Sequence, residues 1–293
     1  LCFANAVRPG NIGIVGASGT GSQEVAARIH DFGGGVSQII GTGGRDLSDK
    51  IGGIMMIDGL RALAADEATK VIVLVSKPPA PSVQAKVLAE AKACGKPVVV
   101  CMLGGSEQAV RDAGLLFGKT TKEAALKAVI LGGKKEEEIN KRALNLPLIA
   151  EVEAKLAPEQ KYIRALMCGG TLCEEMALLA SDMYPNVYSN IAKNPEHKLA
   201  DLNVSREHTF IDFGDDDFTR GRPHPMIDYT LRNKRIAEEA GDPATAVILL
   251  DVVLGYGSNM NPAAELAPVI REAVRKVAVV CCVTGTPEDP QNE

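Results

Sequence analysis

The sequence predicts an α/β protein built from two doubly wound parallel sheets. Short, continuous apolar runs alternate with segments whose apolar residues recur at helical spacing, which indicates strands that helices cover on both faces. The same order of elements then occurs a second time along the chain. With 293 residues, the chain is long enough for two domains that each bury a core.

The first copy is expected in residues 1–132. Its opening unit is an apolar run at residues 12–15, followed by a Gly-rich turn and by the helical pattern of Val25, Ala26 and Ile29. Further strands are expected at residues 36–40, 71–75, 98–103 and 115–117, with helices at residues 54–65, 82–93 and 122–131.

The second copy is expected in residues 159–293, after a charged connection at residues 133–158. Thr171 stands four residues before Glu175, as Thr20 stands four residues before Glu24. A polar insertion at residues 184–206 lengthens this copy, and no fifth strand is expected after the fourth, so its sheet is predicted to be truncated at the C-terminal end. Its strands are expected at residues 163–167, 209–213, 247–253 and 277–283, and a helix at residues 174–180.

Composition and charge exclude several classes of protein. A net charge of -5 and a pI near 5.6 argue against a nucleic-acid partner, which would need a basic face. No apolar run approaches the roughly 20 residues that span a bilayer. Seven cysteines without a Cys-x-x-Cys pair indicate reduced thiols in a cytoplasmic protein. Because the chain begins with Leu1 and has no leader pattern, we expect it to be part of a longer polypeptide.

The turn at residues 16–21 is a candidate anion site. A helix that begins there offers unpaired N–H groups and the positive end of its dipole, and Ser18 or Thr20 can cap the helix or contact a phosphate. The sequence matches neither a P-loop nor a Gly-x-Gly-x-x-Gly turn. The alternative is a tight strand-to-helix turn that binds nothing.

Other polar residues are expected at the same edge of each sheet. Ligands of such sheets bind outside the carboxyl ends of the strands, so a small anionic substrate is expected there. The predicted binding residues are Ser18, Gly19, Thr20, Gly43, Gly44, Arg45 and Lys77 in the first copy, and Gly169, Gly170, Thr171, Asp215 and Arg220 in the second.

His224 and Arg222 are the candidate catalytic residues. Pro223 and Pro225 stiffen the loop around His224, which could serve as an acid, a base or an oxyanion donor, or could be structural. Arg220 and Arg222 could clamp a carboxylate or phosphate, or could pair with the acids at residues 215–217. Those three acids could instead hold Mg²⁺, but adjacent acids point in different directions, so no metal is expected.

Five short motifs stand out along the chain. They are Gly-Ala-Ser-Gly-Thr-Gly at residues 16–21, Gly-Gly-Arg-Asp-Leu-Ser at 43–48, Val-Ser-Lys-Pro-Pro at 75–79, Gly-Gly-Thr-Leu at 169–172 and Gly-Arg-Pro-His-Pro-Met-Ile-Asp at 221–228. These motifs resemble those of FdrA-type proteins, which are predicted acyl-CoA synthetases of the succinyl-CoA synthetase superfamily. The resemblance implies two flavodoxin-like CoA-ligase domains, alpha-type in residues 1–132 and beta-type in residues 159–293. It also implies a CoA-binding-like domain before Leu1.

The chain departs from the synthetases of this superfamily at two points. Residues 104–118 contain no histidine that could be phosphorylated, and Ser76-Lys77-Pro78 stands where the partner glutamate would be. An ATP-grasp domain is also absent from the sequence. The resemblance therefore implies carbamoyl transfer between oxamate and phosphate, in allantoin and purine nitrogen catabolism, rather than a phosphohistidine relay.

We expect CoA, phosphate or carbamoyl phosphate as the ligand of the full-length protein. A homo-oligomer, and other subunits of the same pathway, are the expected partners. The alternative function is a ligand-sensing or scaffolding subunit that has kept the fold and lost the chemistry.

Overall fold

The computed structural model describes residues 3–291 and divides the chain into two compact units. Unit 1 contains the described residues up to Lys141 and again from Gly285, and unit 2 contains Arg142–Thr284. The boundary lies inside the connection predicted at residues 133–158. The last described residues differ from the prediction, because they leave the second unit and join the first.

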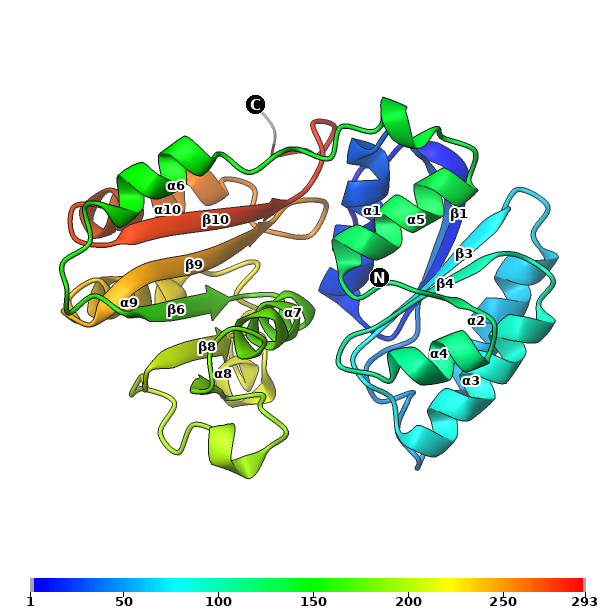
Figure 1. The fold of residues 1–293 in the computed structure, drawn as a ribbon, viewed down its shortest axis with the longest axis horizontal. Helices are drawn as coiled ribbons and strands as arrows, with labels where there is room; N and C mark the ends of the chain where they lie inside the picture. The colour runs from blue at the N-terminus through cyan, green and yellow to red at the C-terminus, as the bar shows by residue number, and fades with distance from the viewer. Residues whose placement is uncertain (1–2, 292–293) are drawn as a thin grey trace. The chain divides into compact units, whose positions relative to one another are not determined.

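Unit 1 holds a parallel five-stranded sheet in the order β2-β1-β3-β4-β5 (Figure 1). Along β3, Val73 and Val75 belong to the core under α1 and α5, whereas Leu74 belongs to the core under α2 and α3. This alternation explains the continuous apolar run of a strand that is buried on both faces. The elements are β1 (Pro9–Gly16), α1 (Gly19–Asp31), β2 (Val36–Gly41), α2 (Ile54–Ala65), β3 (Val71–Ser76), α3 (Pro81–Ala93), β4 (Val98–Met102), α4 (Glu107–Asp112), β5 (Leu116–Phe117) and α5 (Thr121–Leu131).

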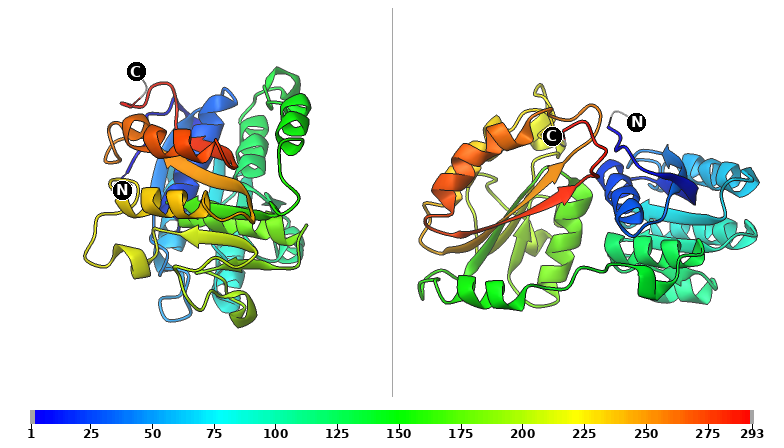
Figure 2. Two further views of the ribbon diagram at one scale, coloured as in Figure 1. Left: turned by 90° about the vertical axis from the view of Figure 1, so that its left-hand side faces the viewer. Right: turned by 90° about the horizontal axis from the view of Figure 1, so that it is seen from above.

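Unit 2 holds a second parallel sheet, in the order β10-β9-β6-β8-β7. One core lies under α7 and the other under α9 and α10, on opposite faces of the sheet (Figure 2). The elements are α6 (Leu146–Glu153), β6 (Tyr162–Met167), α7 (Gly170–Ser181), β7 (Val187–Ser189), β8 (His208–Asp212), α8 (Asp216–Thr219), α9 (Thr230–Glu239), β9 (Thr245–Val253), α10 (Pro262–Ala273) and β10 (Ala278–Thr284).

Strand register aligns the two copies residue by residue. β1 ends at Gly16 and β6 at Met167, each three residues before its helix begins. Val15 pairs with Leu74 of β3, and Leu166 pairs with Leu250 of β9. Position 75 of the first copy therefore corresponds to position 251 of the second. The predicted repeat and the α/β class are confirmed.

The second sheet is completed differently from the prediction. The described residues contain no strand after β10, but the sheet still has five strands, because β7 joins the opposite edge beside β8. β7 lies in the segment that was predicted to be a polar insertion. Its three residues are all buried, which no count of polar residues in the segment could indicate.

The C-terminal segment, residues 285–291, packs against the start of unit 1. The carboxylate of Asp289 is buried and accepts hydrogen bonds from the backbone N–H of Ala6 at 2.6 Å and from Asn5 Nδ2 at 2.8 Å. His30 Nε2 of α1 lies 3.0 Å from Glu288 Oε2. Within residues 3–291, no helix is both long and apolar enough to cross a membrane.

Candidate functional site

The N-terminus of α1 keeps two open donors. Ser18 caps the helix, because its Oγ accepts the N–H of Gly21 at 2.9 Å. In the described part of the chain, the N–H groups of Gly19 and Thr20 donate to no acceptor. Gly16 must lack a side chain, since a Cβ there would lie 2.1 Å from Ser22 Oγ. These residues leave a fixed, positively polarised helix end.

The loop after β2 forms the neighbouring wall of this edge. The N–H of Thr42 donates to the carbonyl of Gly16 at 2.8 Å, and a Cβ on Gly44 would lie 3.6 Å from the Ala17 carbonyl. Arg45 is exposed and forms no ion pair within residues 3–291. A cavity of about 390 Å³ opens here, lined by Thr42, Gly43, Gly44, Arg45, Asp46, Ile51 and Met55.

Asp46 has a structural role rather than a binding one. Its carboxylate accepts the N–H groups of Met55 at 3.0 Å and Met56 at 2.9 Å, at the start of α2. The residue before α2, Gly53, has no side chain to cap the helix, so Asp46 supplies the cap from a distance. Lys77 lies half-buried at the carboxyl end of β3, directly after Ser76.

The N-terminus of α7 differs, because a carboxylate of the chain itself occupies it. Asp251 of β9 accepts the N–H of Cys168 at 2.6 Å and the N–H of Gly169 at 2.7 Å. The predicted anion site at Gly169, Gly170 and Thr171 is therefore corrected in part. The Gly169 donor is already used, and Thr171 is buried.

A buried arginine balances the charge of Asp251. Arg232 of α9 donates from Nη1 to Asp251 Oδ1 at 2.9 Å and to the Asp251 carbonyl at 2.6 Å. Both side chains are 0% exposed. Such a pair is tolerated in a core only when both charges have partners. Burial raises the pKa of the adjacent Cys168 thiol well above its usual value, so this cysteine stays protonated.

His224 lies at the same edge, and the backbone selects its tautomer. The N–H of Met226 donates to His224 Nδ1 at 3.2 Å, so the proton of the neutral ring is on Nε2. A Cβ on Gly214 would lie 3.0 Å from His224 Nε2, 3.0 Å from Asp212 Oδ1 and 2.9 Å from the Cys168 carbonyl. Burial lowers the pKa of His224, and the Asp251 carboxylate opposes this shift. The imidazole is therefore a neutral N–H donor at pH 7.

The loop that carries His224 is held by the loop after β9. The N–H of Asn259 donates to the Met226 carbonyl at 2.8 Å, and its Nδ2 donates to the Ile227 carbonyl at 2.9 Å. The structure thus brings His224 close to the start of α7.

Asp215, Arg220 and Arg222 are spread along this loop. Asp215 caps the short helix α8 by accepting the N–H of Asp217 at 3.1 Å. Arg220 and Arg222 are exposed, and neither forms an ion pair with a described residue, so the predicted alternative of pairing with the acids at residues 215–217 does not occur. Arg222 borders a cavity of about 320 Å³ with apolar walls that include Phe218 and Leu231.

Among residues 3–291, no cluster of three His, Cys, Asp or Glu could hold a metal.

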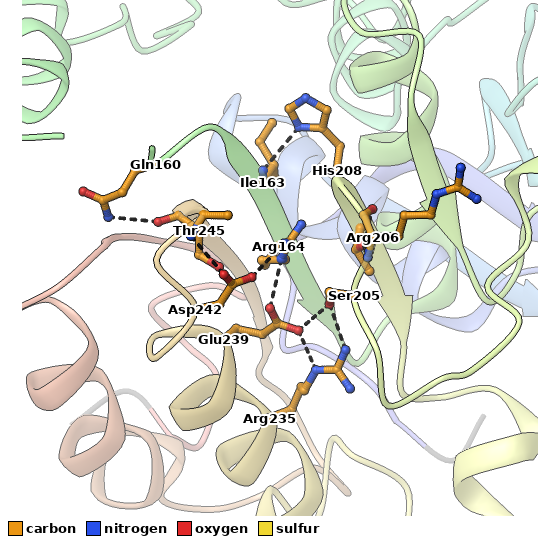
Figure 3. A network of polar contacts seen from close by, with 12 residues as sticks. Gln160, Ile163, Arg164, Ser205, Arg206, His208, Arg235, Glu239, Asp242 and Thr245 are labelled. Carbon is orange, nitrogen blue, oxygen red and sulfur yellow. Dashed lines mark hydrogen bonds and ion pairs between the residues drawn. The ribbon is translucent and has the colours of Figure 1, made fainter. Parts of the chain in front are cut away.

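Two buried polar groups were missed by sequence reasoning. Asp251 stands inside an otherwise apolar strand, and a charged residue at such a position was the sequence signal that could have identified it. The other group is a network at the opposite end of the sheet (Figure 3), in which Arg164 of β6 contacts Glu239 at 2.9 Å and Asp242 at 2.9 Å. Arg235 contacts Glu239 at 2.6 Å. This network joins β6 to α9. Arg235, Glu239 and Asp242 line a cavity of about 550 Å³, and Arg222 lines the same cavity.

Sequence comparisons assign a domain type to each half. Residues 7–104 match the CoA-binding domain, and residues 166–293 match the CoA-ligase domain. The first match falls where an alpha-type CoA-ligase-like domain was expected, with the CoA-binding-like domain placed before Leu1. The matched domain type therefore differs from the type expected for these residues.

Two curated relatives share sequence with the chain. It is 57% identical over 296 residues to the uncharacterized protein YahF of Escherichia coli K12. This match covers 99% of the chain and 58% of YahF. The chain therefore spans little more than half the length of that relative. A stretch of 70 residues, 24% of this chain and 23% of the relative, is 39% identical to subunit alpha 2 of the ADP-forming succinate–CoA ligase of Archaeoglobus fulgidus.

Solved structures give only weak similarity. The apo dinucleotide-forming acetyl-coenzyme A synthetase 1 of Ca. Korarchaeum cryptofilum is 18% identical, with a TM-score of 0.36 over 97% of this chain and 58% of that one. PH0766 of Pyrococcus horikoshii is 12% identical, with a TM-score of 0.33 over 96% and 57%. The similarity is therefore carried by sequence: residues 7–104 and 166–293 match two different domain models, and a 70-residue stretch is similar to a succinate–CoA ligase subunit.

Proposed function

We propose that this chain is the CoA-binding and CoA-ligase part of an FdrA-type enzyme that transfers an acyl or carbamoyl group with phosphate as a reactant. The carbamoyl reaction would be of the oxamate carbamoyltransferase type, in allantoin and purine nitrogen breakdown. The observation that supports this best is the open N-terminus of α1, beside the cavity at Arg45, within the region that matches the CoA-binding domain.

Unit 1 would hold the phosphate group, either of CoA or of carbamoyl phosphate. The N–H groups of Gly19 and Thr20 point their dipoles at the ligand, and Ser18 keeps the first turn in place. Arg45 adds a positive charge that no described carboxylate neutralises. Lys77, at the end of the adjacent β3, supplies a second positive charge.

Unit 2 would bind and polarise the carboxylate substrate. His224 is neutral and keeps its proton on Nε2, which suits a donor to a developing oxyanion. Arg220 and Arg222 are exposed cations without ion pairs in the described chain, so each is available for a carboxylate. Residues 104–118 contain no histidine, and the proposed reaction does not require a phosphorylated histidine.

A ligand-sensing or scaffolding subunit is the second candidate. Asp251 favours it, because an internal carboxylate occupies the helix end that would otherwise accept an anion in unit 2. Under this alternative, unit 1 still binds its ligand, and His224 only stabilises its loop.

The test is phosphate-dependent breakdown of carbamoyl-oxamate by the full-length protein with its partner subunits. We expect His224→Ala and Arg222→Ala each to lower kcat/KM at least tenfold, with Arg275→Ala as the control, since Arg275 is an exposed arginine far along the chain from the loop. Calorimetric titration with CoA and with phosphate supplies the second readout. Binding without turnover in the intact complex would favour the sensing subunit, and absence of both would reject the proposal.

A further inference from the structure

Unit 1 and unit 2 differ in what covers the first helix of each copy. In unit 1, α5 packs on α1 and on the β3 and β4 strands. Val25 and Ala26 of α1 are both completely buried as a result. Because α5 follows β5, the strand and the helix together complete that side of the sheet.

The corresponding positions on α7 pack against the core beneath that helix but are less completely covered. Met176 and Ala177 stand where α1 has Val25 and Ala26, and both are only half-buried. The next residue, Leu178, is 38% exposed, and Met183 beyond the helix is 68% exposed. Apolar side chains on a helix normally face a partner, so this face lacks one.

The neighbouring strand shows the same contrast. β4 pairs with both β3 and β5, whereas β10 pairs only with β9 among the described strands. Val99 pairs with Val73, and Val280 pairs with Leu249 at the corresponding place in unit 2. Val99 is 0% exposed and Val280 is 52% exposed. β10 is thus an apolar edge strand among the described strands, and such an edge is a template for another strand.

The existing helices do not fill this surface, which we call the α7–β10 face and define by Met176, Leu178, Leu249 and Val280. α6 lies on the same side of the sheet as α7 (Figure 2) but has no buried residue. Its apolar Leu146 is 65% exposed, so this side chain is not packed against the sheet.

We propose that the α7–β10 face binds a strand followed by an amphipathic helix, supplied by polypeptide of the same protein outside residues 1–293. The strand would pair with β10 as β5 pairs with β4, and the helix would cover α7 as α5 covers α1. The source is chosen because the 57% identical relative is longer than this match, which covers 58% of it. This inference does not depend on the proposed reaction.

The experiment compares hydrogen exchange in residues 1–293 with exchange in the longer natural protein. We expect at least tenfold slower exchange at residues 174–183 and 278–284 in the longer protein, with α1 and β4 unchanged. The pair Leu178→Lys and Val280→Lys is expected to remove this protection. Ile54→Lys, at a site in unit 1 that is 58% exposed, is the control.

Two results would overturn the proposal. Equal exchange in both proteins would show that the added polypeptide leaves the face open. Protection in residues 1–293 that increases with protein concentration would show that a second copy covers it instead. Because both proteins carry the natural sequence, neither result depends on whether the lysine variants fold.

Discussion

The N-termini of α1 and α7 occupy the same place in two copies of one fold, yet they are satisfied in different ways. α1 is capped by its own Ser18 and keeps the donors of Gly19 and Thr20 open. At α7, the cap residue is Gly169, and the Asp251 carboxylate reaches across from β9. Val75 stands at the position of Asp251 in unit 1, and its side chain is part of the core.

This difference shows that a helix end binds an external anion only if the protein leaves it unfilled. A carboxylate fixed by two N–H groups and by Arg232 cannot leave without exposing a buried charge. The helix end of unit 2 is filled by a buried carboxylate of the chain itself. The helix end of unit 1 keeps open donors, beside the cavity at Arg45.

The largest effect is expected from Asp251→Asn. The change leaves Arg232 buried without a counter-charge, which costs about 3–5 kcal/mol when one partner of a buried pair is lost. This loss of stability is measured by urea unfolding, with hydrogen exchange used to monitor unit 2. Glu272→Gln is the control, since the Glu272–Arg275 pair is exposed and its loss costs at most about 1 kcal/mol. A loss no larger than that of the control would show that Asp251 is not needed to balance Arg232.

Gly214→Ala is expected to have the next largest effect. Its methyl group would contact His224 Nε2, Asp212 Oδ1 and the Cys168 carbonyl at 3.0 Å or less, so the loop must shift at a cost of about 1–3 kcal/mol. Gly44→Ala is the matched change in unit 1, where the nearest atom is the Ala17 carbonyl at 3.6 Å. Thermal unfolding of both variants checks this. Equal losses would contradict the packing described around His224.

Ser18→Asp would make the first helix end resemble the second. Aspartate caps a helix as well as serine does, so unfolding should change little, while the new negative charge repels an anion at Gly19 and Thr20. We expect CoA and phosphate to bind at least tenfold more weakly in calorimetric titration. Ser106→Asp, at the cap of the exposed helix α4, controls for added charge. Unchanged binding would place the ligand elsewhere.

The smallest expected effect is a change in the stability of unit 2 with pH. Burial lowers the pKa of His208 and of His224, and Arg164 adds to the shift of His208. Below the ordinary histidine pKa of about 6.5, the unfolded chain takes up protons before the folded chain does, so stability falls as the pH decreases from 7.5 to 5.5.

The pH effect is measured by the urea midpoint of unit 2 across this range. His208→Gln together with His224→Gln should reduce the slope, because neither replacement titrates. Carboxylates whose pKa is lowered, such as Asp242, titrate below this range and do not interfere. An unchanged slope in the double variant would assign the pH dependence to other groups.

The sequence by itself determined the α/β class, the repeat and the Ser18 turn. These features depend on local periodicity and on small residues between a strand and a helix, which neighbours in the chain are sufficient to show. The motif at residues 221–228 also singled out His224 as a candidate catalytic residue. Its tautomer and lowered pKa required the contact with Met226 and the burial that only the fold provides.

Only the tertiary structure decided which helix end is open. Asp251 lies 82 residues after Gly169, and the two meet because β9 pairs with β6. The same is true of β7, which is a strand only because β8 pairs with it. Contacts between distant segments depend on which strands become neighbours, and local spacing does not contain that information.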